Sequence, residues 1–306
     1  MTSSNDDHAQ APCSPRRSRF IVNSLLALTE LTAAAFGVAS AASWGAGDFC
    51  GGVATKRAGS FPVVIGAHLV GAIGFAVLAI ASGEVRPPLA NLAWCGVAGL
   101  AGAVGLLALY RALAIGRMGL AAPVSGVLSA AVPVLAGLFL DAPPRALQFI
   151  GFGLALVGVW LVARTDDARV DVGALGLPIA AGLGFGLFIV IIGRASAGAV
   201  FWPLVASRLA SLALLTSIGA ATKSGVAAAP RDWGIVALAG AFDAGGNAFL
   251  VAAGHAGRLD VAAVLSSLYP AGTVLLAWSL LNERITRGQF IGLAATLAAI
   301  VVITVP

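Results

Sequence analysis

Charge is scarce in this chain. Only 10% of its 306 residues are Asp, Glu, Lys or Arg, whereas 59% are hydrophobic and the mean hydropathy is +0.97. Soluble globular domains carry about 25% charged residues, so that class is excluded. The 18 basic residues stand singly or in pairs at the ends of apolar runs. This pattern excludes a nucleic-acid-binding surface and suits lipid headgroups.

Residues that hold metals or disulfides are also rare. The three cysteines, Cys13, Cys50 and Cys95, have no metal-ligand or redox spacing, and a disulfide framework is not expected. His68 and His255 each stand alone, without a second metal ligand nearby in the sequence. We therefore expect no metal and no cofactor, and we expect both histidines in core or interface positions.

Long apolar runs are what the chain has in abundance. A helix needs about 17 to 25 apolar residues to cross a bilayer core of roughly 30 Å. Ten such runs are separated by charged or Pro/Gly-rich breaks: Ala33–Ala54, Pro62–Ala81, Leu92–Ala114, Leu120–Leu140, Leu147–Ala163, Gly173–Gly193, Phe201–Ala221, Trp233–Ala253, Val261–Leu281 and Gln289–Val305. We predict an all-α polytopic membrane protein with ten transmembrane helices.

The chain repeats itself at an offset of 141 residues. The tetrapeptide QFIG at Gln148–Gly151 recurs at Gln289–Gly292. The same offset relates Pro62 to Pro203, Gly116-Arg117 to Gly257-Arg258, Ser125 to Ser266 and Asp141 to Asn282. Registered matches without a gap indicate a duplicated unit of five helices. Because five is odd, the second copy enters the membrane from the opposite side, and two inverted repeats are predicted, an arrangement that permits alternating access to a site between them.

The repeat divides the chain into segments. We expect a polar N-terminal tail and juxtamembrane segment over residues 1–32, a first repeat over 33–163, a linker loop over 164–172 and a second repeat over 173–306. The stretch SPRRSRF, Ser14–Phe20, leaves a cleavable export signal open as an alternative to the tail. Basic residues are shared almost equally between odd-numbered and even-numbered loops, so they do not fix the orientation.

Polar residues inside the apolar runs are the candidate site. Asp243 and Asn247 lie four residues apart in the eighth run, so on a helix they share a face. A charged side chain at mid-bilayer costs about 2.5 to 3.5 kcal/mol, so we expect this face to point into the bundle. Asn247 can then donate a hydrogen bond to Asp243 or to whatever Asp243 binds.

Four further residues complete the predicted substrate-binding set. Asp48 shares a helix face with Trp44, a pair that suits a cationic or amphipathic solute, although Asp48 is also close enough to a helix end to be hydrated there. Arg208, inside the seventh run, is a candidate counter-charge for Asp48 or Asp243. Tyr269 adjoins a polar face of the ninth run, where proline kinks could line a solute path or where hydroxyl groups could hold helices together.

Six segments carry a further signal: WGAGDFCGG, YRALAIGR, PVLAGLFL, DAGGN, SSLYPAGTVLLAW and LNERITRGQFIG. With these segments the sequence resembles the EamA-type members of the drug/metabolite transporter superfamily. The resemblance implies ten helices in two inverted five-helix repeats, cytoplasmic termini, and a central cavity built largely by the first four helices of each repeat. One departure is visible: the family's Gly-Glu pair after the fourth helix is Asn282-Glu283 in the second repeat and Asp141-Ala142 in the first.

We predict a secondary transporter, acting as an exporter, that moves a small organic metabolite or drug-like solute by alternating access. Its partners are the solute and the lipid bilayer, a coupling proton is an open option, and nucleic acid is not expected. We expect an integral protein of the bacterial cytoplasmic (inner) membrane that is not an enzyme. The alternative is an intramembrane enzyme acting on a lipid or lipid-linked substrate, but Ser125 and the two isolated histidines do not form the nucleophile or metal constellation that it needs.

Overall fold

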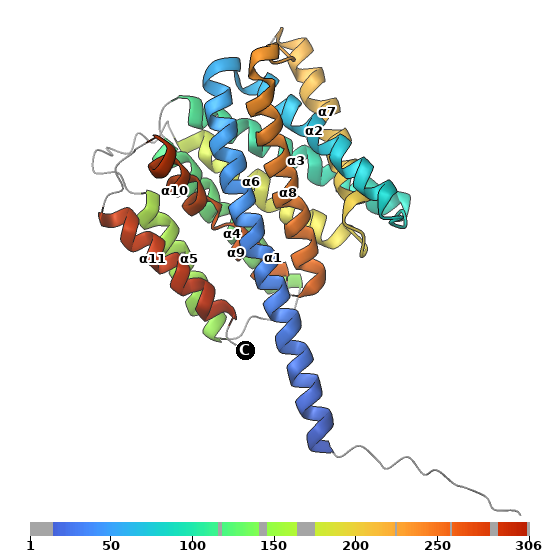
Figure 1. Ribbon diagram of the computed structural model, residues 1–306, viewed down its shortest axis with the longest axis vertical. Coiled ribbons are helices and arrows are strands. Elements are labelled where there is room, and N and C mark those ends of the chain that lie inside the picture. Colours follow the sequence, from blue (N-terminus) through green and yellow to red (C-terminus); the bar gives the residue numbers. More distant parts are fainter. Residues whose placement is uncertain are drawn as a thin grey trace, which may run out of the picture.

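Every secondary-structure element that the structure describes is a helix (Figure 1). This computed structural model describes residues 15–115, 118–140, 146–163, 175–223, 225–257, 259–281 and 287–304. The helices are α1 (Pro15–Ala58), α2 (Ser60–Ala81), α3 (Leu89–Ala114), α4 (Met118–Leu140), α5 (Ala146–Ala163), α6 (Gly176–Ala195), α7 (Phe201–Ala221), the 3-10 turn η2 (Pro230–Asp232), α8 (Trp233–Ala256), α9 (Leu259–Ser266), α10 (Tyr269–Leu281) and α11 (Arg287–Thr304). They occupy each of the ten apolar runs.

The 141-residue offset recurs in the helix bounds. Helix α2 begins at Ser60 and α7 at Phe201, while α5 begins at Ala146 and α11 at Arg287. Two further pairs keep the same register, with α4 matching α9 and α10 together, and α3 matching η2 and α8 together. The fifth pair is α1 and α6, whose bounds do not match at this offset. The internal repeat read from a few matched residues therefore extends to the starts of four of the five helix pairs.

Two helices differ from their predicted extents. The first run was expected to begin at Ala33, but α1 is 44 residues long and begins at Pro15, which makes it about 66 Å long at 1.5 Å per residue. Its N-terminal part projects beyond the other helices (Figure 1). The ninth run was expected to be one helix, but it breaks between α9 and α10. Pro270 explains the break. It lacks the backbone N–H that a helical hydrogen bond needs, and its ring clashes with the backbone carbonyl one turn earlier.

Equivalent helices of the two repeats run in opposite directions where they meet. At one end of the α2–α7 pair, the carboxylate of Glu84, just after α2, accepts hydrogen bonds from backbone N–H groups at the start of α7. At the other end, Gly225, after α7, lies beside Pro62 near the start of α2. Helices α2 and α7 are therefore antiparallel, as equivalent elements of two oppositely oriented bundles must be.

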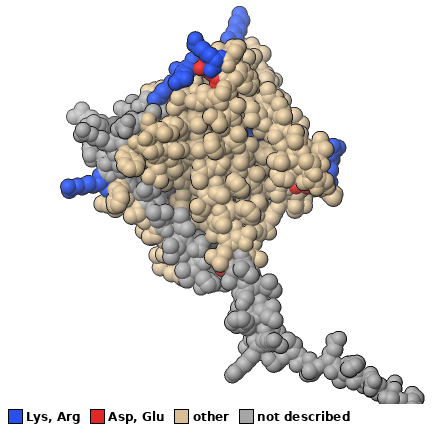
Figure 2. Space-filling model, in the orientation of Figure 1, with Lys and Arg blue, Asp and Glu red and all other residues tan. Residues whose placement is uncertain are grey.

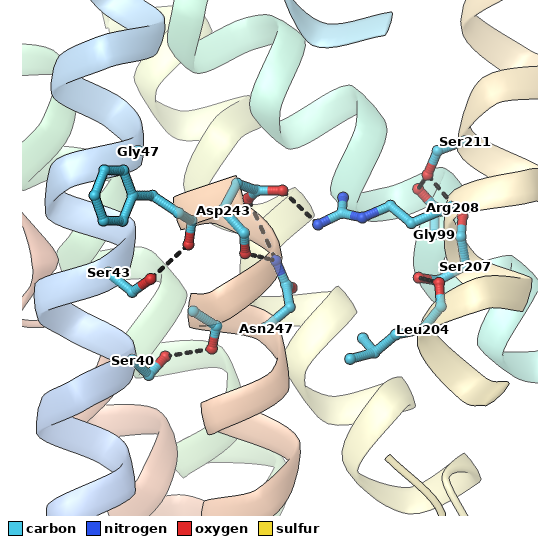
Figure 3. A network of polar contacts seen from close by, with 12 residues as sticks. Ser40, Ser43, Gly47, Gly99, Leu204, Ser207, Arg208, Ser211, Asp243 and Asn247 are labelled. Atoms are coloured by element: carbon cyan, nitrogen blue, oxygen red, sulfur yellow. Dashed lines mark hydrogen bonds and ion pairs between the residues drawn. The ribbon is translucent and has the colours of Figure 1, made fainter. Parts of the chain in front are cut away.

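The contacts between the two repeats also come in equivalent pairs. Helix α1 packs along α8, and the matching pair, α6 and α3, packs in the same way. Ser40 on α1 donates to the Gly246 carbonyl at 2.8 Å, and Ser43 donates to the Phe242 carbonyl at 2.7 Å (Figure 3). Helices α5 and α11 pair with each other and stand to one side of the remaining helices (Figure 1).

The surface of the bundle is apolar over broad areas. Figure 2 shows lysine and arginine side chains at the periphery and a wide face between them that carries almost no charge. Large hydrophobic side chains are exposed there and elsewhere, including Ile80 at 72% and Trp94 at 60%. Six helical stretches among the described residues are long and apolar enough to cross a membrane: Ser60–Ala81, Leu89–Ala114, Gly176–Ala195, Phe201–Ala221, Pro230–Ala256 and Ala262–Leu280. Such a surface suits acyl chains rather than water.

Candidate functional site

A cavity in the centre of the bundle collects all six residues of the predicted site. Trp44 and Asp48 enter it from α1, Arg208 from α7, Asp243 and Asn247 from α8, and Tyr269 from α10. The cavity measures about 40 Å³, which is room for about three water molecules, because one needs roughly 10 to 15 Å³. Both repeats thus contribute polar groups to one space inside the bundle.

Asp243 and Arg208 form a buried ion pair across α7 and α8. The Arg208 Nη2 group donates a hydrogen bond to Asp243 Oδ2, and the two residues are 6% and 8% exposed (Figure 3). Asn247 donates from Nδ2 to the Asp243 backbone carbonyl at 2.6 Å and to Oδ1 at 3.3 Å. The expected contact between Asn247 and Asp243 is confirmed, and of the two carboxylates proposed for Arg208, the structure pairs it with Asp243.

Asp48 is different because its carboxylate has no hydrogen-bond partner among the described residues. It is 7% exposed and faces the same cavity. It is not hydrated at a helix end, the alternative that the sequence left open. Helices α1 and α8 approach closely beside it, since a Cβ atom on Gly47 would lie 3.1 Å from the Asp243 backbone nitrogen. An unpaired carboxylate therefore sits one helix away from a paired one.

Aromatic rings form one wall of the cavity. The rings of Trp44 and Tyr269 meet edge to face, with centroids 6.1 Å apart and planes at 86°. The Tyr269 hydroxyl is fixed by Ser125 at 2.8 Å, and the neighbouring hydroxyls of Ser129 and Ser267 lie 3.1 Å apart. Helix α4 is thereby bonded to the broken ninth run. Hydroxyl groups hold these helices together, and Ser129 and Tyr269 also line the cavity.

Glycines let the helices around the cavity approach one another. A Cβ on Gly99 would overlap the backbone carbonyl of Ser207 on α7, and one on Gly246 would overlap the Trp44 ring. A Cβ on Gly105 would lie 2.9 Å from the Phe185 ring on α6. Gly99 and Gly105 on α3 therefore allow α7 and α6 to pack closely against it.

Sequence reasoning missed several residues that line the cavity. His68, expected in a core or interface position, is 1% exposed, and its Nδ1 has no hydrogen-bond partner among the described residues. Phe185 and Ile189 on α6 also line it. The 141-residue offset could have predicted these two, since Phe185 is the equivalent of Trp44 in the second repeat and Ile189 is the equivalent of Asp48. No comparable signal marked His68.

The charged groups break the symmetry of the repeats. The residues equivalent to Asp48, Asp243 and Arg208 are Ile189, Gly102 and Ala67. One unpaired carboxylate therefore belongs to the first repeat and one ion pair to the second. The cavity has two chemically different sides although its backbone is pseudo-symmetric.

The model of the EamA-like transporter family matches residues 31–164 and again residues 172–305. The chain belongs to the EamA-like transporter family. It is an integral membrane protein built from two repeats of that family. No curated protein sequence is detectably similar to the chain.

Several solved structures share the fold of this EamA-like chain. Among them is a crystal structure with a TM-score of 0.72 and 16% sequence identity, and the match covers 89% of this chain and 97% of the other. As the resemblance implied, the cavity-lining residues come from α1 to α4, α6 to α8 and α10, and none comes from the described parts of α5 or α11. The departure at Asp141-Ala142 and Asn282-Glu283 lies outside the described residues.

Proposed function

We propose that this protein is a secondary transporter that moves a small organic metabolite or drug-like solute across the bacterial cytoplasmic membrane, with export as its direction. Ten spans, with α9 and α10 together forming the ninth, make two inverted repeats. The observation that carries the proposal is the central cavity, to which both repeats contribute buried polar side chains. Sites of this kind, at the interface of inverted repeats, are typical of alternating access.

The substrate-binding residues that we propose are Asp243, Asn247, Asp48, Trp44, Tyr269 and Arg208. Their burial supports this role, because ionisable groups at membrane depth face protein or a water-filled path and mark solute or ion pathways. At about 40 Å³ the cavity is far smaller than the roughly 300 to 1,000 Å³ of sites for drug-sized ligands. A solute larger than a few water molecules must therefore separate the helices that surround it, which is the motion alternating access requires.

Flux measured in proteoliposomes tests the proposal. Vesicles containing the purified full-length protein are loaded with a labelled metabolite extract, and the solutes released are identified by mass spectrometry against protein-free vesicles. We expect at least one solute to leave chemically unchanged. Release of a converted product would support the intramembrane enzyme instead, and no protein-dependent release would contradict a transporter. Proton coupling is tested in the same vesicles, since a coupled solute gradient must move protons and change an internal pH dye.

A further inference from the structure

We propose that the solute recognised by the central cavity is a small organic monocation, held by the carboxylate of Asp48 against the aromatic wall. The inference rests on the proposed transport function and adds the charge class of the solute. It begins from a count of charges. The described residues lining the cavity include two carboxyl groups, Asp48 and Asp243, one guanidinium, Arg208, and the imidazole of His68; Arg208 pairs with Asp243, so one carboxyl group is left without a cationic partner.

The carboxyl group without a cationic partner is that of Asp48. Arg208 donates to Asp243, and Asn247 bonds the same carboxylate, so this group is internally neutralised (Figure 3). Asp48 has no such partner among the described residues although it is 7% exposed. An isolated buried carboxylate is costly, and it is retained where it binds a cation or exchanges one for a proton. Asp48 thus lacks a counter-charge, and an organic cation would bind it in this cavity once the surrounding helices separate.

The surroundings of Asp48 suit an organic cation better than a hydrated metal ion. Trp44, Tyr269, Phe185 and Phe188 line the same cavity. The faces of such rings attract ammonium groups, and the attraction grows when water is excluded. Their apolar area also favours hydrocarbon substituents on the cation.

The other side of the cavity discourages anions. An anionic solute at Arg208 would compete with Asp243 for the one guanidinium and would add a third negative group beside Asp48 and Asp243. Arg208 Nε, which can only donate, and His68 Nδ1, which donates or accepts according to its tautomer, have no hydrogen-bond partner among the described residues, so polar parts of the solute can bond to them once the cavity opens. A solute with a single positive charge would give the Asp48 carboxylate the counter-charge that it lacks.

Charge-matched probes test this inference. Two sets of similar size are used: choline, 3,3-dimethylbutan-1-ol and 3,3-dimethylbutanoate, and phenethylammonium, 2-phenylethanol and phenylacetate. Each is added to the purified full-length protein, and the melting temperature is measured for the wild type, Asp48→Asn, Asp48→Glu and Asp232→Asn. Asp232, 4% exposed at the start of α8, is the control carboxylate outside the cavity.

We expect at least one cation to raise the melting temperature by roughly 5 °C near a hundredfold excess over its Kd. Its neutral and anionic counterparts should shift it far less. The shift should disappear in Asp48→Asn, return at least partly in Asp48→Glu and persist in Asp232→Asn. Without any solute, Asp48→Asn should melt no lower than the wild type, because it removes an unpaired buried charge; this outcome separates lost recognition from lost folding.

The inference is overturned if neither cation acts more strongly than its neutral counterpart, or if an anion does, or if the Asp48→Asn protein responds like the wild type. The vesicle assay keeps this failure apart from failure of the transport function. Release of neutral or anionic metabolites would leave a transporter with the wrong charge class assigned. Release of none would overturn both.

Discussion

The guanidinium of Arg208 on α7 donates a hydrogen bond to the carboxylate of Asp243 on α8, and both residues are buried in the middle of the bundle. Removing one partner of a buried pair leaves the other charge uncompensated, which costs about 3 to 5 kcal/mol, whereas removing both costs much less. The pair therefore predicts strong coupling between the two positions.

A double-mutant cycle of Arg208→Gln and Asp243→Asn measures this coupling. Each single variant should lower the free energy of unfolding in detergent by about 3 kcal/mol or more, and the double variant should recover a large part of the loss. Arg231→Gln is the control, because the Arg231 side chain is 83% exposed and should contribute less than about 1 kcal/mol. Additive losses in the cycle would show that the two side chains do not depend on each other.

Close helix contacts at glycine predict a second set of effects. Gly99→Ala and Gly240→Ala should each destabilise the protein by about 1 to 3 kcal/mol, because the new methyl group meets the backbone of Ser207 or of Ala67. Gly74→Ala is the matched control, since nothing lies within 4 Å of its added Cβ. The melting temperatures of the three variants are compared, and those of Gly99→Ala and Gly240→Ala should be lower than that of Gly74→Ala. Equal melting temperatures would mean that the helices are not in close contact at Gly99 and Gly240.

Glu84 predicts a local effect at one end of the α2–α7 pair. Its carboxylate accepts backbone hydrogen bonds from Val200, Phe201 and Trp202, at 2.7 to 3.1 Å. Hydrogen bonds to a charged group contribute about 1.5 to 3 kcal/mol, so Glu84→Gln should speed amide exchange at these three positions by about tenfold or more. Glu30→Gln on α1 is the control. Unchanged exchange in Glu84→Gln would mean that this carboxylate does not hold the start of α7.

Much of the fold could be predicted because the membrane restricts what a sequence can do. Backbone groups in lipid must be bonded within a helix, so each apolar run predicts a helix, and helices do occupy all ten runs. The break at Ser267–Leu268 was less visible, because a proline in a run indicates a kink or a break equally well. The start of α1 at Pro15 was missed because its first turns are polar, and hydropathy marks only the part that lipid requires.

The site could be predicted one helix at a time and no further. A spacing of four residues placed Asn247 beside Asp243, since both lie on one helix. The choice of Asp243 rather than Asp48 as the partner of Arg208 depends on the packing of α7 and α8, which no local spacing encodes. His68 was missed for the same reason, because a lone histidine carries no sign of the cavity that other helices build around it.

The central claim is that two equivalent bundles lie in opposite orientations around the shared cavity. Ser82 and Lys223 test it most directly, because they are exposed, stand 141 residues apart and follow the equivalent helices α2 and α7. Single cysteines at these positions, in a protein whose three native cysteines are replaced, are labelled with a membrane-impermeant maleimide in intact cells and in inverted vesicles. We predict that Ser82→Cys and Lys223→Cys react from opposite sides of the membrane. Labelling of both from the same side would contradict the inverted repeat and, with it, the proposed transport mechanism.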